Sequence, residues 1–532
     1  MSMTETRPAT GSTSSRVDAD QAAGDTAAPS GLQGWISTAD HKRIGRLYLC
    51  TAVGFLVVGS VVGAILGAER LGSGLEILSD NTFGQVYTLH GEVAVFGFLV
   101  PFFLGLATYL VPLQVGAPDI AFARGAALGY WTYLVSGLLL LAAYAANGGP
   151  RGGSDIGVDL HLLALIGLNL ALVVGLISVL TTALAWRTRG MSLLRTPLFT
   201  WSVVVGGGLT LLACPVLVAR LVEGYVSHHF GDVDLATSDT SWFFAVPQVF
   251  MLAVPAAGVA AEVIPVMARS RHRVHGAAVV ILGVLGVLGF GAWAQLPERA
   301  DELLYVGVAI AALLPALALL GLLGDTTRRG RLSFGAANLL ALGAVIHLLL
   351  GALAGAAAAI EPLELQGTVW QAAQVHYTLY GAATLGAFAA LWFWAPKIWG
   401  VLLGELQGKV VFALTFFGAI LLSAPDLVNG LVEDRLLGEP RFDSSGLTTA
   451  LDAASLIGGV LGVIGVLVVV GELLGKAGRR KGAPASDDPW GGATLEWATT
   501  SPPPTGNFAG PVPLVVSAAP LHDARTASEV DA

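Results

Sequence analysis

The chain has 532 residues, of which 54% are hydrophobic and only 12% are charged, and its mean hydropathy is +0.71. Soluble domains carry about 25% charged residues, so this composition excludes a cytosolic enzyme and a disordered scaffold. The formal net charge of −9 offers no basic surface for phosphate groups, which argues against a nucleic-acid-binding protein.

The N-terminal residues 1–33 are rich in Ser, Thr, Ala, Asp and Gly and contain no apolar segment, so we expect a disordered cytoplasmic tail and not a signal peptide. From residue 44 onward the chain is a series of apolar runs, each long enough for the roughly 20 residues that cross a bilayer. Backbone polar groups in lipid must be bonded within the chain, so these runs are predicted to be helices. The twelve predicted helices lie near 44–68, 88–112, 124–146, 160–186, 195–222, 243–268, 274–296, 302–324, 333–359, 370–394, 409–431 and 453–475.

These helices predict an all-α integral membrane protein with one twelve-helix membrane domain over residues 34–476. Residues 477–532 are polar and proline-rich and are expected to form a cytoplasmic C-terminal tail. Alternate connections are rich in cations, such as Arg269, Arg271 and Arg273, whereas the others carry carboxylates, such as Glu361 and Glu364. This bias predicts a multi-pass protein of the cell (plasma or inner) membrane with both termini in the cytoplasm.

Ionisable side chains inside a membrane are costly and are therefore functional candidates. His161 lies at the extracytoplasmic start of a predicted helix, and three further histidines, His90, His347 and His376, lie within the predicted spans. His90 and His376 each follow closely on the extracytoplasmic start of a helix, so they lie at comparable depth. Two axial imidazoles make a six-coordinate, low-spin haem suited to electron transfer. Alternatively, each histidine bonds a backbone carbonyl or a neighbouring helix, and we favour such a structural role for His347. The histidines expected on solvated surfaces are His41, His228, His229, His272, His275 and His522.

Several longer stretches resemble subunit I of the haem–copper oxidases, of the cytochrome c oxidase type, over about residues 36–510. They are the segments 38–45 (TADHKRIG), His90-Gly91, 109–119 (YLVPLQVGAPD), 490–497 (WGGATLEW), 501–504 (SPPP) and Asn507-Phe508. The resemblance implies a twelve-helix fold, in agreement with the number of apolar runs. It also implies that His90 and His376 are the two ligands of a low-spin haem.

The resemblance also shows departures from the family pattern at the oxygen-reducing centre. On the sixth helix the family has His-Pro-Glu-Val-Tyr, where this chain has Val-Pro-Gln-Val-Phe (246–250); on the seventh it has Trp-Ala-His-His, where this chain has Trp-Ala-Gln-Leu (293–296). On the tenth helix the family has His-x-His, and here Gln374 replaces the first histidine. The positions of the lost copper and high-spin haem ligands are therefore Val246, Gln295, Leu296 and Gln374.

The proton pathways of the family are also incomplete in this sequence. Asp119 matches the proton-uptake carboxylate, but the asparagines expected near it are Thr108 and Ala126. The inner relay glutamate is Gln248, and the eighth helix lacks the lysine of the second pathway. Gly67 replaces an arginine that contacts the ring substituent of haem A, which favours a b-type haem without excluding an a-type one.

From these residues we expect a cytochrome c oxidase subunit I-like membrane haem protein with one low-spin haem, of b or a type, and no copper. It would pass electrons in a respiratory-type complex with subunit II- and III-like partners, without oxygen reduction or proton pumping. No catalytic residue is expected, and whether the chain is an enzyme stays open because the oxygen-reducing residues are replaced. The alternatives are an active terminal oxidase subunit I, that is, a cytochrome c oxidase of aerobic respiration, and a haem-free structural or transport subunit.

Overall fold

The computed structural model describes residues 31–71, 77–150, 152–231, 249–293, 302–432, 446–478 and 484–530. The chain divides into two units, Met1–Thr38 and Ala39–Ala532. In the first unit, the described part contains the short helix α1 (Gly31–Ile36). In the second unit the regular elements among the described residues are helices, apart from an isolated bridge between Val401 and Pro484.

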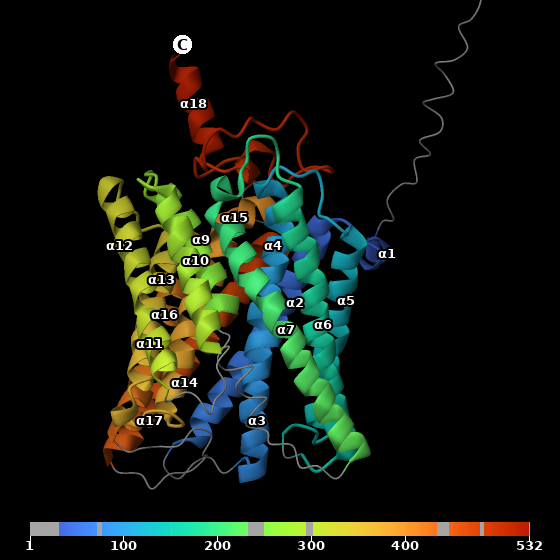
Figure 1. Ribbon diagram of the computed structural model, residues 1–532, viewed down its shortest axis with the longest axis vertical. Coiled ribbons are helices and arrows are strands. Elements are labelled where there is room, and N and C mark those ends of the chain that lie inside the picture. The colour runs from blue at the N-terminus through green and yellow to red at the C-terminus, as the bar shows by residue number, and fades with distance from the viewer. Residues whose placement is uncertain are drawn as a thin grey trace, which may run out of the picture. The chain divides into compact units, whose positions relative to one another are not determined.

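Within the described ranges, eleven helices are long and apolar enough to cross a membrane, and in Figure 1 they run alongside one another. They are α2 (His41–Glu69), α3–η1–α4 (Asp80–Gln114), α5 (Ala123–Ala145), α6 (Asp155–Ala185), α7 (Leu198–Phe230), α10 (His275–Trp293), α11 and α12 (Leu303–Arg329), α13 (Ala336–Ala358), α14–η6–α15 (Val369–Trp399), α16 (Glu405–Val432) and α17–η7 (Gly446–Gly478). The remaining short elements are η2 (Leu193–Arg195), η5 (Glu361–Leu363), η8 (Leu495–Ala498) and α18 (Pro520–Val530).

A shorter apolar helix, η3 (Val249–Ala253) continuing into α9 (Val254–Met267), lies where the sixth membrane helix is predicted. The first residues of that prediction, 243–248, lie outside the described residues. The predicted all-α membrane protein is confirmed, and the eleven long helices with this shorter one come close to the predicted twelve.

Side-chain caps fix where several of these helices begin. The Asp40 carboxylate accepts a hydrogen bond from the Lys42 amide at the start of α2. Ser79 and Ser154 accept bonds from amides in the first turns of α3 and α6. Such caps satisfy amides that have no partner within the helix.

Two helices lie at the centre of the second unit. In the most apolar stretches of Asp80–Gln114 and Val369–Trp399, 94% of the residues are buried, against 22% for Leu303–Arg329. Both central helices change to π-helical geometry part of the way along, at η1 (Val93–Leu99) and η6 (Tyr377–Ala383). Single π-helical turns inside α-helices are frequently found at functional sites.

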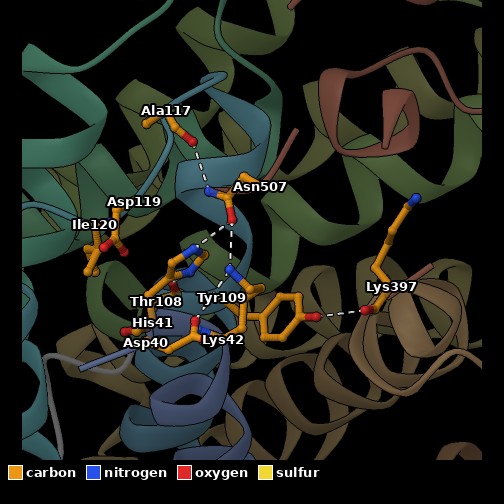
Figure 2. A network of polar contacts seen from close by, with 10 residues as sticks. All are labelled: Asp40, His41, Lys42, Thr108, Tyr109, Ala117, Asp119, Ile120, Lys397 and Asn507. Atoms are coloured by element: carbon orange, nitrogen blue, oxygen red, sulfur yellow. Dashed lines mark hydrogen bonds and ion pairs between the residues drawn. The ribbon is translucent and has the colours of Figure 1, made fainter. Parts of the chain in front are cut away.

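The C-terminal segment is tied to the ends of α2 and α4 by the polar network of Figure 2. The Asn507 side-chain oxygen lies 2.9 Å from His41 Nε2 and accepts a bond from Lys42 Nζ at 3.0 Å, while its amide donates to the Ala117 carbonyl at 2.8 Å. His41 is therefore fully buried, and the expectation that it lies on a solvated surface is wrong. That expectation failed because Asn507, which covers His41, is more than 460 positions away in the sequence.

Candidate paired-histidine site

His90 lies on α3 (Asp80–Glu92), and two glycines of α2 determine how its ring is held. Its Nδ1 lies 3.0 Å from the Gly59 carbonyl oxygen, which can only accept, so Nδ1 carries the proton and donates. One turn further along α2, a Cβ at Gly63 would lie 2.7 Å from the ring carbon Cε1 of His90. The carbonyl fixes the tautomer that leaves Nε2 with a free lone pair, which is the usual arrangement of a metal-ligating histidine.

His376 is the last residue of α14 (Val369–His376), and its ring faces that of His90. The ring centres are 6.5 Å apart and the ring planes make an angle of 62°. With metal–nitrogen bonds of about 2.0–2.1 Å and about 1.2 Å from each nitrogen to its ring centre, two imidazoles on one metal ion place their centres about 6.4–6.6 Å apart. The spacing of the pair thus fits two axial ligands of one iron.

The two histidines of the pair are held differently. The His376 Nδ1 atom is buried and has no hydrogen-bond partner among the described residues, so no carbonyl fixes its tautomer as Gly59 does for His90. Among the described residues, no group of three or more His, Cys, Asp or Glu side chains is arranged to hold a metal ion. Two imidazoles without a further protein ligand suit a metal whose other ligands come from a porphyrin ring. Of the four ligand positions expected to be replaced, Val246, Gln295 and Leu296 lie outside the described residues.

Gln374, at an expected ligand position on the tenth membrane helix, faces α13 (Ala336–Ala358). A Cβ at Gly355 would lie 2.6 Å from Gln374 Nε2, and a Cβ at Gly351 would lie 2.5 Å from Thr378 Oγ1. The atoms close to Gly355 all belong to the Gln374 side chain, so this glycine leaves room for the end of that side chain.

His347 lies on α13 and is fully buried. Its Nε2 donates to the Phe416 carbonyl at 3.2 Å, and its ring packs edge-on against the Phe416 ring at 4.8 Å between centres. A Cβ at Gly381 would lie within 2.6 Å of the His347 ring. These contacts agree with the structural role expected for His347.

The region around the matched proton-uptake residue offers few free polar groups. The Asp119 carboxylate accepts a bond from the Ile120 amide, and the Thr108 hydroxyl donates to the Leu104 carbonyl of its own helix. A cavity of about 40 Å³ lies between α4, α6, α7 and η3–α9. Its walls are largely apolar, and the hydroxyl of Thr210, which lines it, already donates to the Gly206 carbonyl. A water molecule needs two to four polar partners, which these walls do not provide.

Sequence reasoning missed two buried polar clusters near the histidine pair. Glu92, two residues after His90, lies 3.0 Å from His161 Nε2 and accepts a bond from the Tyr144 hydroxyl at 2.9 Å. Asp426 accepts two bonds from the Arg70 guanidinium. A carboxylate inside an apolar run was the available signal for both Glu92 and Asp426, because such a residue is costly in a membrane.

A third buried carboxylate, Glu496, lies in η8 outside the membrane helices. Its Oε1 accepts bonds from Gln114 Nε2 at 3.0 Å and Trp394 Nε1 at 3.2 Å, whereas its Oε2 has no hydrogen-bond partner among the described residues. Burial raises the pKa of the Glu496 carboxyl above its ordinary value, and these hydrogen bonds offset only part of that rise.

The fold and the site together define a multi-pass helical membrane protein with a paired-imidazole site between its central helices. Residues 43–461 match the family described as cytochrome C and quinol oxidase polypeptide I. The chain therefore belongs to this family, the subunit I family of the haem–copper oxidases, whose members bind haem.

Individual relatives agree with this assignment. The chain is 32% identical to the putative cytochrome c oxidase subunit 1-beta of Streptomyces avermitilis, over 92% of this chain and 91% of the relative. It is 31% identical to the cytochrome c oxidase subunit 1 of Corynebacterium efficiens, over 93% and 90% of the two chains. A solved structure of a heme-copper terminal oxidase dimer shares the fold, with a TM-score of 0.67 at 16% identity over 82% of this chain and 84% of that chain. The resemblance inferred from the sequence motifs is thus confirmed at the level of the family.

Proposed function

We propose that this chain holds a single low-spin haem between His90 and His376 and passes electrons within a multi-subunit membrane complex, without reducing oxygen itself. The observation that carries the proposal is the facing pair of imidazoles, 6.5 Å between ring centres, on the two most enclosed helices. A haem held by the two imidazoles would supply one-electron transfer and would offer no open position to oxygen.

The residues around the pair have distinct tasks in this proposal. The Gly59 carbonyl orients the His90 ring and fixes its tautomer, and Gly63 leaves room for it. His90 and His376 are themselves partly buried, and the stretches that follow them along the two central helices are almost wholly buried. A fixed ligand geometry in an apolar environment keeps the structural change on electron transfer small and controls the redox potential.

We infer that the oxygen-reducing centre is absent because its four ligand positions are Val246, Gln295, Leu296 and Gln374. Oxygen reduction needs an open iron position and a second metal nearby, and these side chains supply neither. The packing of Gln374 against Gly355 supports this inference, since the side chain at the former iron-ligand position is held against α13. We therefore expect no copper and no second haem.

We also infer that the chain does not pump protons. Gln248 cannot titrate, and the cavity between α4, α6, α7 and η3–α9 lacks the polar lining that a chain of water molecules requires. The protein is proposed to lie in the cell membrane with both termini in the cytoplasm. Residues 1–33 and 477–532 would form cytoplasmic tails before and after the membrane domain in the sequence. Subunit II- and III-like chains are the proposed partners.

The principal alternative is an active terminal oxidase subunit I, which the names of the relatives favour. Optical spectra of the purified protein, with and without carbon monoxide, together with its copper content distinguish the two. We expect one reduced low-spin band that carbon monoxide does not change, and no stoichiometric copper. A carbon monoxide-binding haem together with copper would establish the active oxidase instead.

The same spectra test the third possibility, a haem-free structural or transport subunit. That possibility requires a purified chain without a Soret band. We expect His90→Ala and His376→Ala each to abolish the low-spin signal, whereas the control His347→Ala, which removes a buried histidine outside the pair, retains it. Retention of the low-spin signal by both ligand variants would contradict the proposed ligands.

A further inference from the structure

A buried ionic cluster joins three membrane helices close to the histidine pair. Arg70, at the end of α2, donates from its two terminal nitrogens to Asp426 of α16, at 2.7 and 3.1 Å. Asp452 of α17 lies 3.8 Å from the same guanidinium and accepts a bond from Asn429. Both carboxylate side chains are at most 1% exposed, and that of Arg70 is 16% exposed.

Helix packing places this cluster beside His376. Along α16, Gly418 packs against the Tyr380 hydroxyl and Gly430 packs against Trp370, so α16 runs antiparallel to the segment that contains His376. Asp426 lies between these two contacts. Asp426, and with it the Arg70 guanidinium that it binds, therefore lies beside the stretch between Trp370 and Tyr380 that contains His376.

The position of the same cluster relative to His90 follows from helix α2. Gly63 of α2 packs against the His90 ring, and Arg70 is seven residues further along the same helix. At 1.5 Å per residue this offset is about 10 Å. The charges therefore lie on one side of the imidazole pair, toward the end of α2 that is farther from His41.

Buried charges about 10 Å from a redox centre change its potential strongly, because little water lies between them to screen the interaction. The ferric state of an iron centre carries one more positive charge than the ferrous state. A nearby carboxylate therefore favours the ferric state and lowers the potential, while a guanidinium favours the ferrous state and raises it.

We propose that Arg70, Asp426 and Asp452 set the midpoint potential of the haem held by His90 and His376, with the two carboxylates lowering it and Arg70 raising it. This inference rests on the proposed function. The three residues are positioning residues for the electron-transfer step, because they act on the haem through its electrostatic surroundings and not as its ligands.

The test is a spectroelectrochemical titration of the low-spin haem in the full-length protein. We expect Asp426→Asn to raise the midpoint potential and Arg70→Gln to lower it. One buried unit charge is expected to change the ferric-to-ferrous equilibrium about tenfold, which corresponds to about 59 mV for one electron. Asp325→Asn, which removes a carboxylate paired with surface arginines at the end of α12, is the matched control and should leave the potential unchanged.

Opposite signs for the two substitutions are the decisive result, since a merely structural role would move both potentials in the same direction or neither. Shifts of the same sign, or unchanged potentials with the low-spin band retained, would overturn the proposal. If Asp426→Asn does not assemble, Asp452→Asn carries the test, and an unchanged or lower potential overturns it. A wild-type protein without a low-spin haem would instead contradict the proposed function.

Discussion

The Nδ1 atom of His90 donates to the carbonyl oxygen of Gly59 at 3.0 Å, and this bond joins the first two membrane helices at the proposed haem ligand. Gly59 accepts the hydrogen bond from the His90 ring. Gly63, one turn further along the same helix, has no side chain and so leaves room for that ring. The orientation of the ring thus depends on two residues that cannot themselves ligate a metal.

The substitution Gly63→Ala tests this dependence. An added Cβ would lie 2.7 Å from His90 Cε1, so the ring or the helix must shift. Overpacking of this kind costs about 1–3 kcal/mol, and we expect reduced haem occupancy or a displaced low-spin band. The matched control is Gly54→Ala on the same helix, where a Cβ meets nothing within 4 Å. Equal spectra and equal haem occupancies for the two variants would show that the His90 ring does not depend on the space at Gly63.

Much of the membrane architecture could be predicted from the sequence because each span is a long apolar run that must satisfy its own backbone in lipid. The sixth helix was harder to delimit: its described part is short and apolar, and residues before Val249 lie outside the described ranges. The candidates His90 and His376 were identifiable because an imidazole in an apolar run is rare and both match a family motif.

The surroundings of the pair could not be predicted in the same way. The bond from His90 to Gly59 and the ion pair between Arg70 and Asp426 join residues 31 and 356 positions apart. Such contacts depend on how helices pack, and no local periodicity encodes this. The π-helical segments η1 and η6 are themselves largely apolar, like the α-helical segments that follow them, so composition does not mark the change of geometry.

The side chain of Asn507 is expected to hold the C-terminal segment against the membrane domain. Asn507→Ala removes the acceptor of Lys42 Nζ, the contact with His41 Nε2 and the donor to the Ala117 carbonyl. Leaving buried polar partners unsatisfied costs about 1–3 kcal/mol, so we expect a lower melting temperature in detergent and faster proteolysis of the C-terminal segment. Asn81→Ala, at an exposed position of α3, is the control. An unchanged rate of proteolysis in the Asn507 variant would show that Asn507 does not hold the C-terminal segment in place.

Glu496 should make stability depend on pH. Burial raises the pKa of its carboxyl in the folded protein, so the unfolded state releases this proton at lower pH than the folded state. The contribution of Glu496 to stability is therefore fully present below the unfolded pKa of about 4.3 and is lost as pH rises through the folded value.

Glu496→Gln removes this titration while keeping an oxygen for Gln114 and Trp394. We expect the melting temperature of the variant, relative to wild type, to increase as the pH is raised from about 4. Glu361→Gln, which changes an exposed carboxyl, should follow the wild-type profile. A pH-independent difference between the Glu496 variant and wild type would show that the buried carboxyl does not titrate in this range.

Restoring one expected ligand tests the proposed absence of a second metal centre. Gln374→His reinstates the histidine at the family position, where the Gln374 side chain now packs against Gly355 of α13. Because the substitution restores one of four ligand positions, and because Val246, Gln295 and Leu296 still offer no copper ligand, we expect no second haem and no carbon monoxide band. The haem-to-protein ratio and the carbon monoxide difference spectrum of the variant measure this directly. A ratio near two with a new carbon monoxide band would mean that the high-spin site persists and needs only its iron ligand.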